Sequence, residues 1–172
     1  MRPLASLQID IAEGYKRAIV MNSCDRPTKG EFHMSSKDAA PVPARPAATV
    51  IILRDGPEGI EVFMVERRRE IEFASGALVF PGGKVDTGDS DAVWAELAAQ
   101  APPAPDAAFF VAAGRETFEE AGLMLARRPG TPEIIDADMA HRIVEAHRAR
   151  LLKGDTTFAD IVRSEGLVLA VT

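Results

Sequence analysis

The chain has 172 residues, a hydrophobic content of 47% and a formal net charge of −6 at pH 7. This length predicts one domain, and the negative charge without a basic stripe argues against a nucleic-acid partner. No apolar run reaches the length of a membrane span, and the single cysteine, Cys24, excludes an internal disulfide. We therefore expect a globular cytoplasmic protein with neither a nucleic-acid nor a membrane partner.

Residues 1–46 are predicted to be a flexible extension ahead of a domain that covers 47–172. A short helix is expected near Leu4–Val20, and the rest of 1–33 shows no clear period. Ser, Lys, Ala and Pro dominate the segment from Met34 to Pro46, a composition typical of flexible linkers. Met34 is an alternative natural start, and the sequence alone leaves that choice open.

Three short strands are expected next in the chain. The β-branched run Ala47–Leu53 and the segment Ile60–Glu66 flank turn residues at 55–59, so they are predicted to form a hairpin. Ala77–Phe80 is the third strand, and Pro81-Gly82-Gly83 ends it. Glycines let a backbone approach a metal or a phosphate closely, which favours a functional loop here over an ordinary tight turn.

The segment after these strands contains a short helix and a proline-rich connector. The helix is expected over Asp91–Gln100, with Trp94 and Leu97 on one side. Trp94 is expected to pack locally rather than to form an interaction surface. The connector covers 101–105, and its prolines exclude helix there.

A helix that follows Asp106 as N-cap and ends before Gly122 is predicted to carry three glutamates on one face. Glu116, Glu119 and Glu120 stand at offsets 0, +3 and +4, which share one side of a helix. Neighbouring carboxylates repel one another, so a hard divalent cation such as Mg²⁺ or Mn²⁺ is the expected partner. A solvated acidic face is the alternative.

The opposite face of this helix is expected to pack against a sheet, which would hold the helix and its glutamates in place. It is apolar and contains a glycine, so it can press closely on a sheet; its members are Phe110, Val111, Gly114, Thr117, Phe118 and Ala121. Arg115 precedes Glu119 by four residues, which allows an ion pair that holds the carboxylate. The helix is therefore expected to be amphipathic, with an ordered acidic side.

Two more helices and a strand are expected in the rest of the chain, each helix starting at a capping side chain. The expected elements run from Asp136 or Asp138 to Leu152, from Thr156 or Thr157 to Arg163, and over Leu167–Val171. His141 and His147 in the first of these helices are six residues apart and share no face. They are not expected to bind a metal.

The sequence at 115–123, Arg-Glu-Thr-Phe-Glu-Glu-Ala-Gly-Leu, resembles the core of the Nudix box, R-E-U-x-E-E-x-G-U, where U is a bulky aliphatic residue. In that box a glycine also precedes a glutamate by six positions. Here Gly83 precedes Asp89 by six positions, so Asp stands in place of Glu. Thr117 departs from the pattern. The 25 residues from Ser90 to Gly114 also exceed the seven of the standard box.

An insertion of this kind is familiar from one Nudix branch, the coenzyme A diphosphatases of the Nudix-19 type. The preceding stretch is similar too, because the three arginines at 67–69, Gly76 and the Phe80-Pro81-Gly82-Gly83 segment resemble the motif of coenzyme A-cleaving Nudix enzymes. The resemblance covers about 49–123 well and 124–172 loosely.

The resemblance implies an α/β (α+β) fold, a Nudix-type α/β/α sandwich around a mixed sheet with an insert at 90–106. Only 49 residues follow Leu123, so we expect the fold to be incomplete at its C-terminal end. It also implies a hydrolase in which water attacks a diphosphate linkage with the help of Mg²⁺ or Mn²⁺. Coenzyme A or acyl-CoA would yield 3′,5′-ADP and (acyl-)4′-phosphopantetheine.

Three alternatives remain open at this point. One is another pyrophosphatase of the same family that acts on an ADP-sugar or a nucleotide. A second is a Nudix-like binding module without catalysis. The third is an acidic helix on an unrelated α/β domain, which predicts that no loop of Gly82 and Gly83 faces the helix.

The site residues follow from the same resemblance. The implied metal ligands are Glu116, Glu119 and Glu120, together with a carbonyl of Gly82 or Gly83. The implied catalytic residues are Glu116, as a ligand or the general base, Glu119, and Arg115, which orients a glutamate. Phosphate contacts are expected from Arg67, Arg68 and Lys84. The substrate is expected to be a small nucleotide-type molecule, and the sequence leaves the oligomeric state open between monomer and homodimer.

Overall fold

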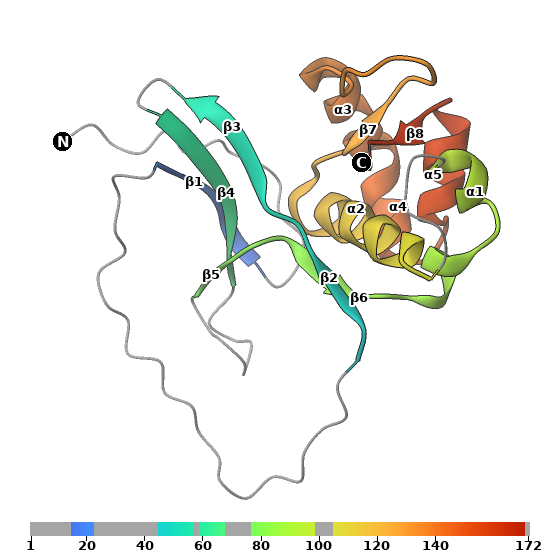
Figure 1. Ribbon diagram of the computed structural model, residues 1–172, viewed down its shortest axis with the longest axis horizontal. Helices are drawn as coiled ribbons and strands as arrows, with labels where there is room; N and C mark the ends of the chain where they lie inside the picture. Colours follow the sequence, from blue (N-terminus) through green and yellow to red (C-terminus); the bar gives the residue numbers. More distant parts are fainter. Residues whose placement is uncertain (1–14, 23–44, 57–58, 68–76, 99–104, 171–172) are drawn as a thin grey trace, which may run out of the picture.

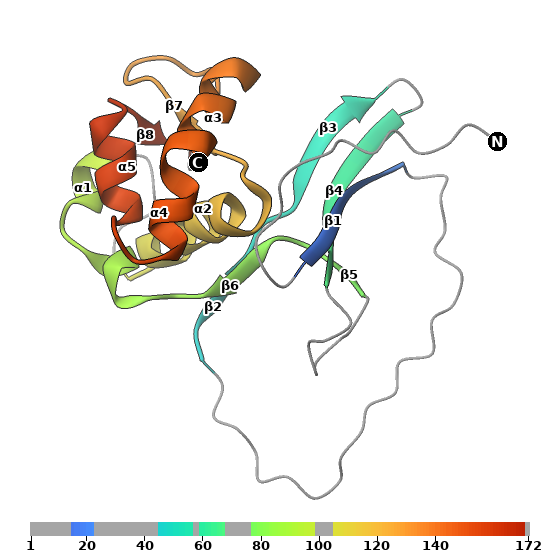
Figure 2. The ribbon, with the colours of Figure 1, turned by 180° about the vertical axis from the view of Figure 1, so that it is seen from behind.

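The computed structural model describes residues 15–22, 45–56, 59–67, 77–98 and 105–170. A sheet-rich part built mainly from the earlier residues lies beside a helical part built from the later ones (Figures 1 and 2). The long helix α2 (Ala107–Ala121) lies on the side of the helical part that faces the strands.

The main sheet of the strand-rich part is antiparallel, with β4 (Gly59–Arg67) at its centre. β1 (Tyr15–Asn22) and β3 (Ile52–Gly56) flank β4, and β5 (Leu78–Val79) pairs with it near Val65. Gly56 lies opposite Gly59, which confirms the predicted hairpin. The expected helix near Leu4–Val20 is wrong for the part that is described, because Tyr15–Asn22 is a strand.

A second, two-stranded sheet joins β2 (Ala47–Thr49) to β6 (Gly82–Lys84), with Thr49 opposite Gly82. The predicted strand Ala47–Leu53 is therefore split between two sheets at Val50 and Ile51. Gly82 and Gly83 lie in a strand, whereas the sequence predicted that they end one. All the strand pairs of the described residues are antiparallel, so the parallel pairs of a mixed sheet are not seen there.

The helical part surrounds α2 with short elements. They are η1 (Thr87–Ser90), α1 (Trp94–Leu97), β7 (Ala126–Arg127), α3 (Ala137–Ile143), the π-helical segment η2 (Val144–Arg148), α4 (Ala149–Leu152), α5 (Phe158–Ser164) and β8 (Val168–Leu169). α3, η2 and α4 follow one another without a break, so together they form one helix of the length predicted from the sequence. None of the helices among the described residues combines the length and the apolar composition of a membrane span.

The larger hydrophobic core lies in the helical part. Phe118 of α2 and Trp94 of α1 both pack on Phe158 of α5, each with ring centroids 5.8 Å apart. Gly114 leaves room for Leu169, whose methyl carbons would lie 3.7 Å from a Cβ at that position. A smaller core joins α2 to β4 and contains Phe63, Val65 and Ala121. Most of the apolar face of α2 thus packs on the later helices and β8, not on the sheet as predicted.

The ends of the helices follow the local sequence. Gly122 has the left-handed conformation predicted for it, with φ 65°. The Asp136 and Thr157 side chains accept hydrogen bonds from the helical backbone, which confirms these two N-caps. Asp106 stands at the N-cap position of α2, but its side chain makes no capping hydrogen bond.

Candidate active site

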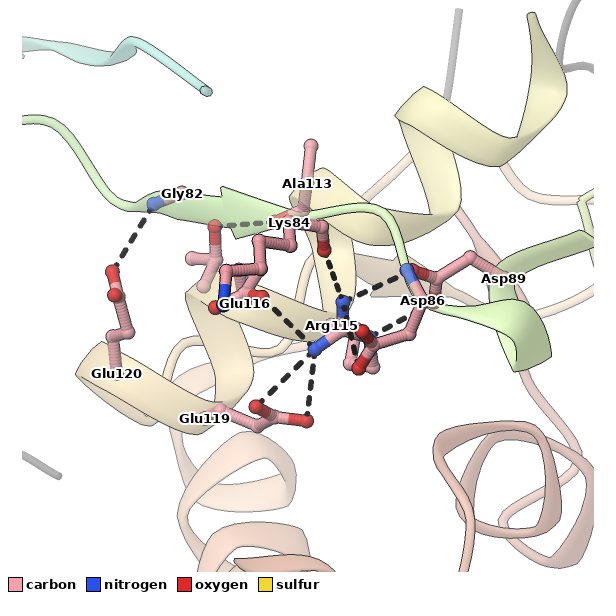
Figure 3. A network of polar contacts seen from close by, with 10 residues as sticks. Gly82, Lys84, Asp86, Asp89, Ala113, Arg115, Glu116, Glu119 and Glu120 are labelled. Carbon is pink, nitrogen blue, oxygen red and sulfur yellow. Dashed lines mark hydrogen bonds and ion pairs between the residues drawn. The ribbon is translucent and has the colours of Figure 1, made fainter. Parts of the chain in front are cut away.

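The acidic face of α2 is turned towards β6, the strand that contains the two glycines (Figure 3). The backbone N–H of Gly82 donates a hydrogen bond of 3.1 Å to Oε2 of Glu120. The Glu116 carboxylate lies so close to Gly83 that a Cβ on this glycine would collide with it. The predicted glutamates and glycines are therefore brought together by packing of α2 against β6.

Arg115 forms the centre of the polar network in Figure 3. Its guanidinium binds Asp89 through two hydrogen bonds of 2.9 Å, and it donates a third, of 2.8 Å, to the Lys84 carbonyl. Its Nη1 also reaches Glu116 at 3.0 Å and both oxygens of Glu119 at 3.3 Å. The predicted pair of Arg115 and Glu119 is confirmed, but the two-pronged contact of the guanidinium, at 2.9 Å, goes to Asp89.

Asp89 is the site residue to which the sequence assigned no role. It is 2% exposed and holds Arg115, while its Oδ2 also accepts the backbone N–H of Asp86 at 2.8 Å. Asp86 itself is exposed and lies 3.7 Å from the guanidinium. The six-residue offset from Gly83 was the available signal for Asp89. The structure shows what that offset achieves: it places a buried carboxylate against the arginine of α2.

The electrostatics of this face are those of crowded, partly buried carboxylates. Burial raises the pKa of Glu116 to about 7, with smaller contributions from Glu119 and Glu120, while Arg115 acts in the opposite direction. Burial likewise raises the pKa of Glu119, against the attraction of Arg115. Burial by itself would lower the pKa of Arg115. Asp89, followed by Glu119 and Glu116, outweighs burial and raises this pKa above its usual value, so the side chain stays charged.

The donor chemistry of the acidic face fits a hard divalent cation. It offers three carboxylates that are at most about a quarter exposed, at one end of a helix. In the present side-chain positions Glu116 and Glu119 turn to Arg115, and Glu120 turns to the Gly82 N–H. Among the residues that the structure describes, no three acidic, histidine or cysteine side chains converge on one point. A shared ion would require rotamer changes in these glutamates.

The predicted phosphate-binding residues are only partly described. Lys84 is exposed at the end of β6, close to the network through its backbone carbonyl. Arg67 is the last residue of β4, and its side chain is not described. Arg68 lies outside the described residues. Phosphate contacts by these three side chains stay a prediction.

Comparison with known proteins finds similarity both in sequence and in structure. No protein-family model matches the sequence. An alignment of 107 residues shows 32% identity to the acyl-coenzyme A diphosphatase NUDT19 of Gallus gallus, and it covers 45% of this chain and 28% of that protein. The crystal structure of a NUDIX hydrolase from Alicyclobacillus acidocaldarius matches with a TM-score of 0.54 and 31% identity, covering 76% of this chain and 58% of the other.

Sequence and fold therefore agree on the class of protein that the chain resembles: its sequence is similar to that of Nudix hydrolases, and its mixed α/β structure matches a Nudix hydrolase fold. Within the aligned part it resembles NUDT19, as the inserted box predicted. The chain spans less than a third of the length of that relative and somewhat over half of the solved structure. An acidic helix on an unrelated domain is excluded, because Gly82 and Gly83 do face the glutamates.

Proposed function

We propose that this chain is a divalent-cation-dependent hydrolase of diphosphate linkages, acting on coenzyme A or an acyl-CoA. The observation that carries the proposal is the packing of the carboxylates of α2 against Gly82 and Gly83, with Arg115 locked to Asp89 beside them. The resemblance to NUDT19, which is named an acyl-coenzyme A diphosphatase, supports coenzyme A or an acyl-CoA as the substrate.

The roles of the glutamates follow from their positions. Glu119 and Glu120 stand in the last turn of α2 and would hold Mg²⁺ or Mn²⁺. Such an ion neutralises phosphate charge, polarises the phosphoryl group and lowers the pKa of water. Glu116, which lies against Gly83, is the carboxylate that would take the proton of the attacking water or serve as a further ligand.

The reaction is a displacement at phosphorus. The oxygen of water forms a bond to one phosphorus of the diphosphate, and the bond from that phosphorus to the bridging oxygen breaks. From coenzyme A the products are 3′,5′-ADP and 4′-phosphopantetheine. The contribution of this chain is to fix the carboxylates, through Arg115 and the β6 backbone, on one side of the reacting phosphate. Lys84 and the arginines at 67–68 would supply positive charge for the remaining phosphate oxygens.

A substrate panel tests the proposal. The full chain is incubated with Mg²⁺ and coenzyme A, an acyl-CoA, ADP-ribose or a dNTP, and the products are separated by chromatography. We expect 3′,5′-ADP from the first two substrates. A preference for ADP-ribose or dNTP would instead favour the ADP-sugar or nucleotide pyrophosphatase. Metal binding without any hydrolysis would favour the non-catalytic binding module.

Two isosteric variants test the assignment of the carboxylates. Glu119→Gln and Glu120→Gln are expected to lower turnover by roughly 10²–10⁴, the range for loss of an electrostatic or acid–base group. Glu133→Gln, at an exposed position outside α2, is the matched control and should retain full activity. Unchanged Mg²⁺-dependent hydrolysis in both site variants would overturn the assignment.

A further inference from the structure

The carboxyl end of α2 presents the backbone carbonyls of Glu119 and Glu120 to donors from another part of the fold. The last carbonyls of any helix lack intrahelical donors and need other ones. Here the N–H of Gly122 binds the carbonyl of Phe118, and the N–H of Leu123 binds that of Thr117. Neither of these two bonds goes to the carbonyl of Glu119 or Glu120, the residues proposed as metal ligands.

Arg148 provides the donors that this helix end lacks. Its Nε and Nη2 bind the Glu119 carbonyl at 3.0 and 2.8 Å, and Nη2 binds the Glu120 carbonyl at 3.2 Å. The side chain is 7% exposed and comes from η2, the π-helical segment that contacts α2. One guanidinium thus holds the backbone of both glutamates from a separate helix.

The contact between Arg148 and these carbonyls has two physical effects on the end of α2. A cation at the carboxyl end of a helix offsets the negative end of the helix dipole, and this end carries three carboxylates as well. Hydrogen bonds from a planar guanidinium to two successive carbonyls also fix the last turn in orientation, which a single-point donor does less well. The direction in which Glu119 and Glu120 project depends on that turn.

We propose that Arg148 is a positioning residue for the hydrolysis, acting through the backbone of Glu119 and Glu120 without touching the substrate. The proposal rests on the proposed function. Removal of the guanidinium is expected to let the last turn of α2 shift, so that the two carboxylates no longer meet one cation. A positioning residue around a metal site typically accounts for roughly 10–100-fold in metal affinity or activity.

The experiment compares Arg148→Met and Arg148→Lys with the unaltered full chain at a temperature where circular dichroism shows all of them folded. Mn²⁺ affinity is measured by electron paramagnetic resonance of the free ion, and kcat and KM are measured with coenzyme A. We expect Arg148→Met to weaken Mn²⁺ binding and lower kcat by roughly 10–100-fold, with KM changed much less. Arg148→Lys should recover part of both, because it restores the charge and one donor.

Arg127→Met is the matched control, because Arg127 also donates to a backbone carbonyl, that of Thr131, in a part of the molecule away from the acidic face. Its Mn²⁺ affinity and kcat should equal those of the unaltered chain. Folded Arg148→Met with unchanged Mn²⁺ affinity and kcat would overturn the proposal, as would equal losses in Arg127→Met.

The outcome separates this proposal from the proposed function. If the unaltered chain binds Mn²⁺ but hydrolyses nothing, the proposed function fails, and a loss of Mn²⁺ affinity confined to the Arg148 variants still supports positioning. Absence of Mn²⁺ binding by the unaltered chain would overturn both.

Discussion

The two faces of α2 differ in what holds them. The apolar face packs against rings and aliphatic side chains, with Phe118 fully buried on Phe158. The acidic face meets the backbone of β6, and its positive partner is Arg115, which Asp89 holds in place. Apolar packing depends little on direction, whereas each contact of the acidic face has a defined donor and acceptor. The first face fixes where the helix lies, and the second fixes how its carboxylates point.

The largest expected loss of stability comes from the apolar face. Phe118→Ala removes a fully buried ring and is expected to lower the free energy of unfolding by ~3–5 kcal/mol, measured by urea denaturation. Phe109→Ala is the control, since Phe109 lies on the same helix and is 38% exposed, and it should cost about 1 kcal/mol or less. Similar losses in both variants would mean that the large core does not position α2.

A somewhat smaller loss is expected from the acidic face. Asp89→Asn leaves the buried guanidinium of Arg115 with a weaker partner and should cost about 3 kcal/mol in chemical denaturation. Turnover should fall as well, because Arg115 then no longer holds Glu119 in place. Asp86→Asn makes the same change in charge at an exposed site and should leave both measurements close to the unaltered values. Equal effects of the two variants would contradict a special role for the buried pair.

The raised pKa of Glu116 predicts a dependence of stability on pH. Because the folded state binds the Glu116 proton more tightly than the unfolded state does, the free energy of unfolding falls as pH rises from about 4.5 to about 7. The change from this group is at most ~3 kcal/mol. Denaturation in EDTA across this range measures it, and Glu116→Gln should flatten the profile. An equally steep profile in that variant would assign the dependence to other groups.

The smallest effects on stability are expected from the two glycines of β6. One glycine should affect mainly stability and the other mainly activity. A Cβ on Gly82 would meet the backbone carbonyl of Ala48, so Gly82→Ala should destabilise by about 1–2 kcal/mol. A Cβ on Gly83 would meet the Glu116 carboxylate, which can move, so Gly83→Ala should lower activity with little change in stability. Gly88→Ala, with only one atom at 3.9 Å, is the control. Thermal melts and turnover decide between these outcomes.

The parts of the site that could be predicted from sequence are those set by neighbours along the chain. Offsets within one helix gave the acidic face and the pair of Arg115 and Glu119, and local composition gave the left-handed Gly122. The Nudix fold and the α/β class were predicted from the box, and the comparisons confirm them.

The remaining features depend on residues far apart in the chain. Arg115 meets Asp89 across 26 positions, and Arg148 meets Glu119 across 29. Nothing in the helical period around Arg148 distinguishes it from a solvated arginine. The division of Ala47–Leu53 between two sheets was also missed, because β-branched residues favour a strand without specifying its partner.

The ion pair between Asp89 and Arg115 bears on the length of the box. It joins the two residues on either side of the 25-residue segment 90–114, so the two ends of this segment meet at the acidic face. In a flexible loop, growth from seven to 25 residues would add only about 1 kcal/mol of closure entropy. Trp94 and Leu97 are buried and recover part of this through packing. The fold therefore tolerates a longer segment between Asp89 and Arg115 than the standard box has. Shortening this segment while keeping Asp89 and Arg115 should leave the acidic face in place.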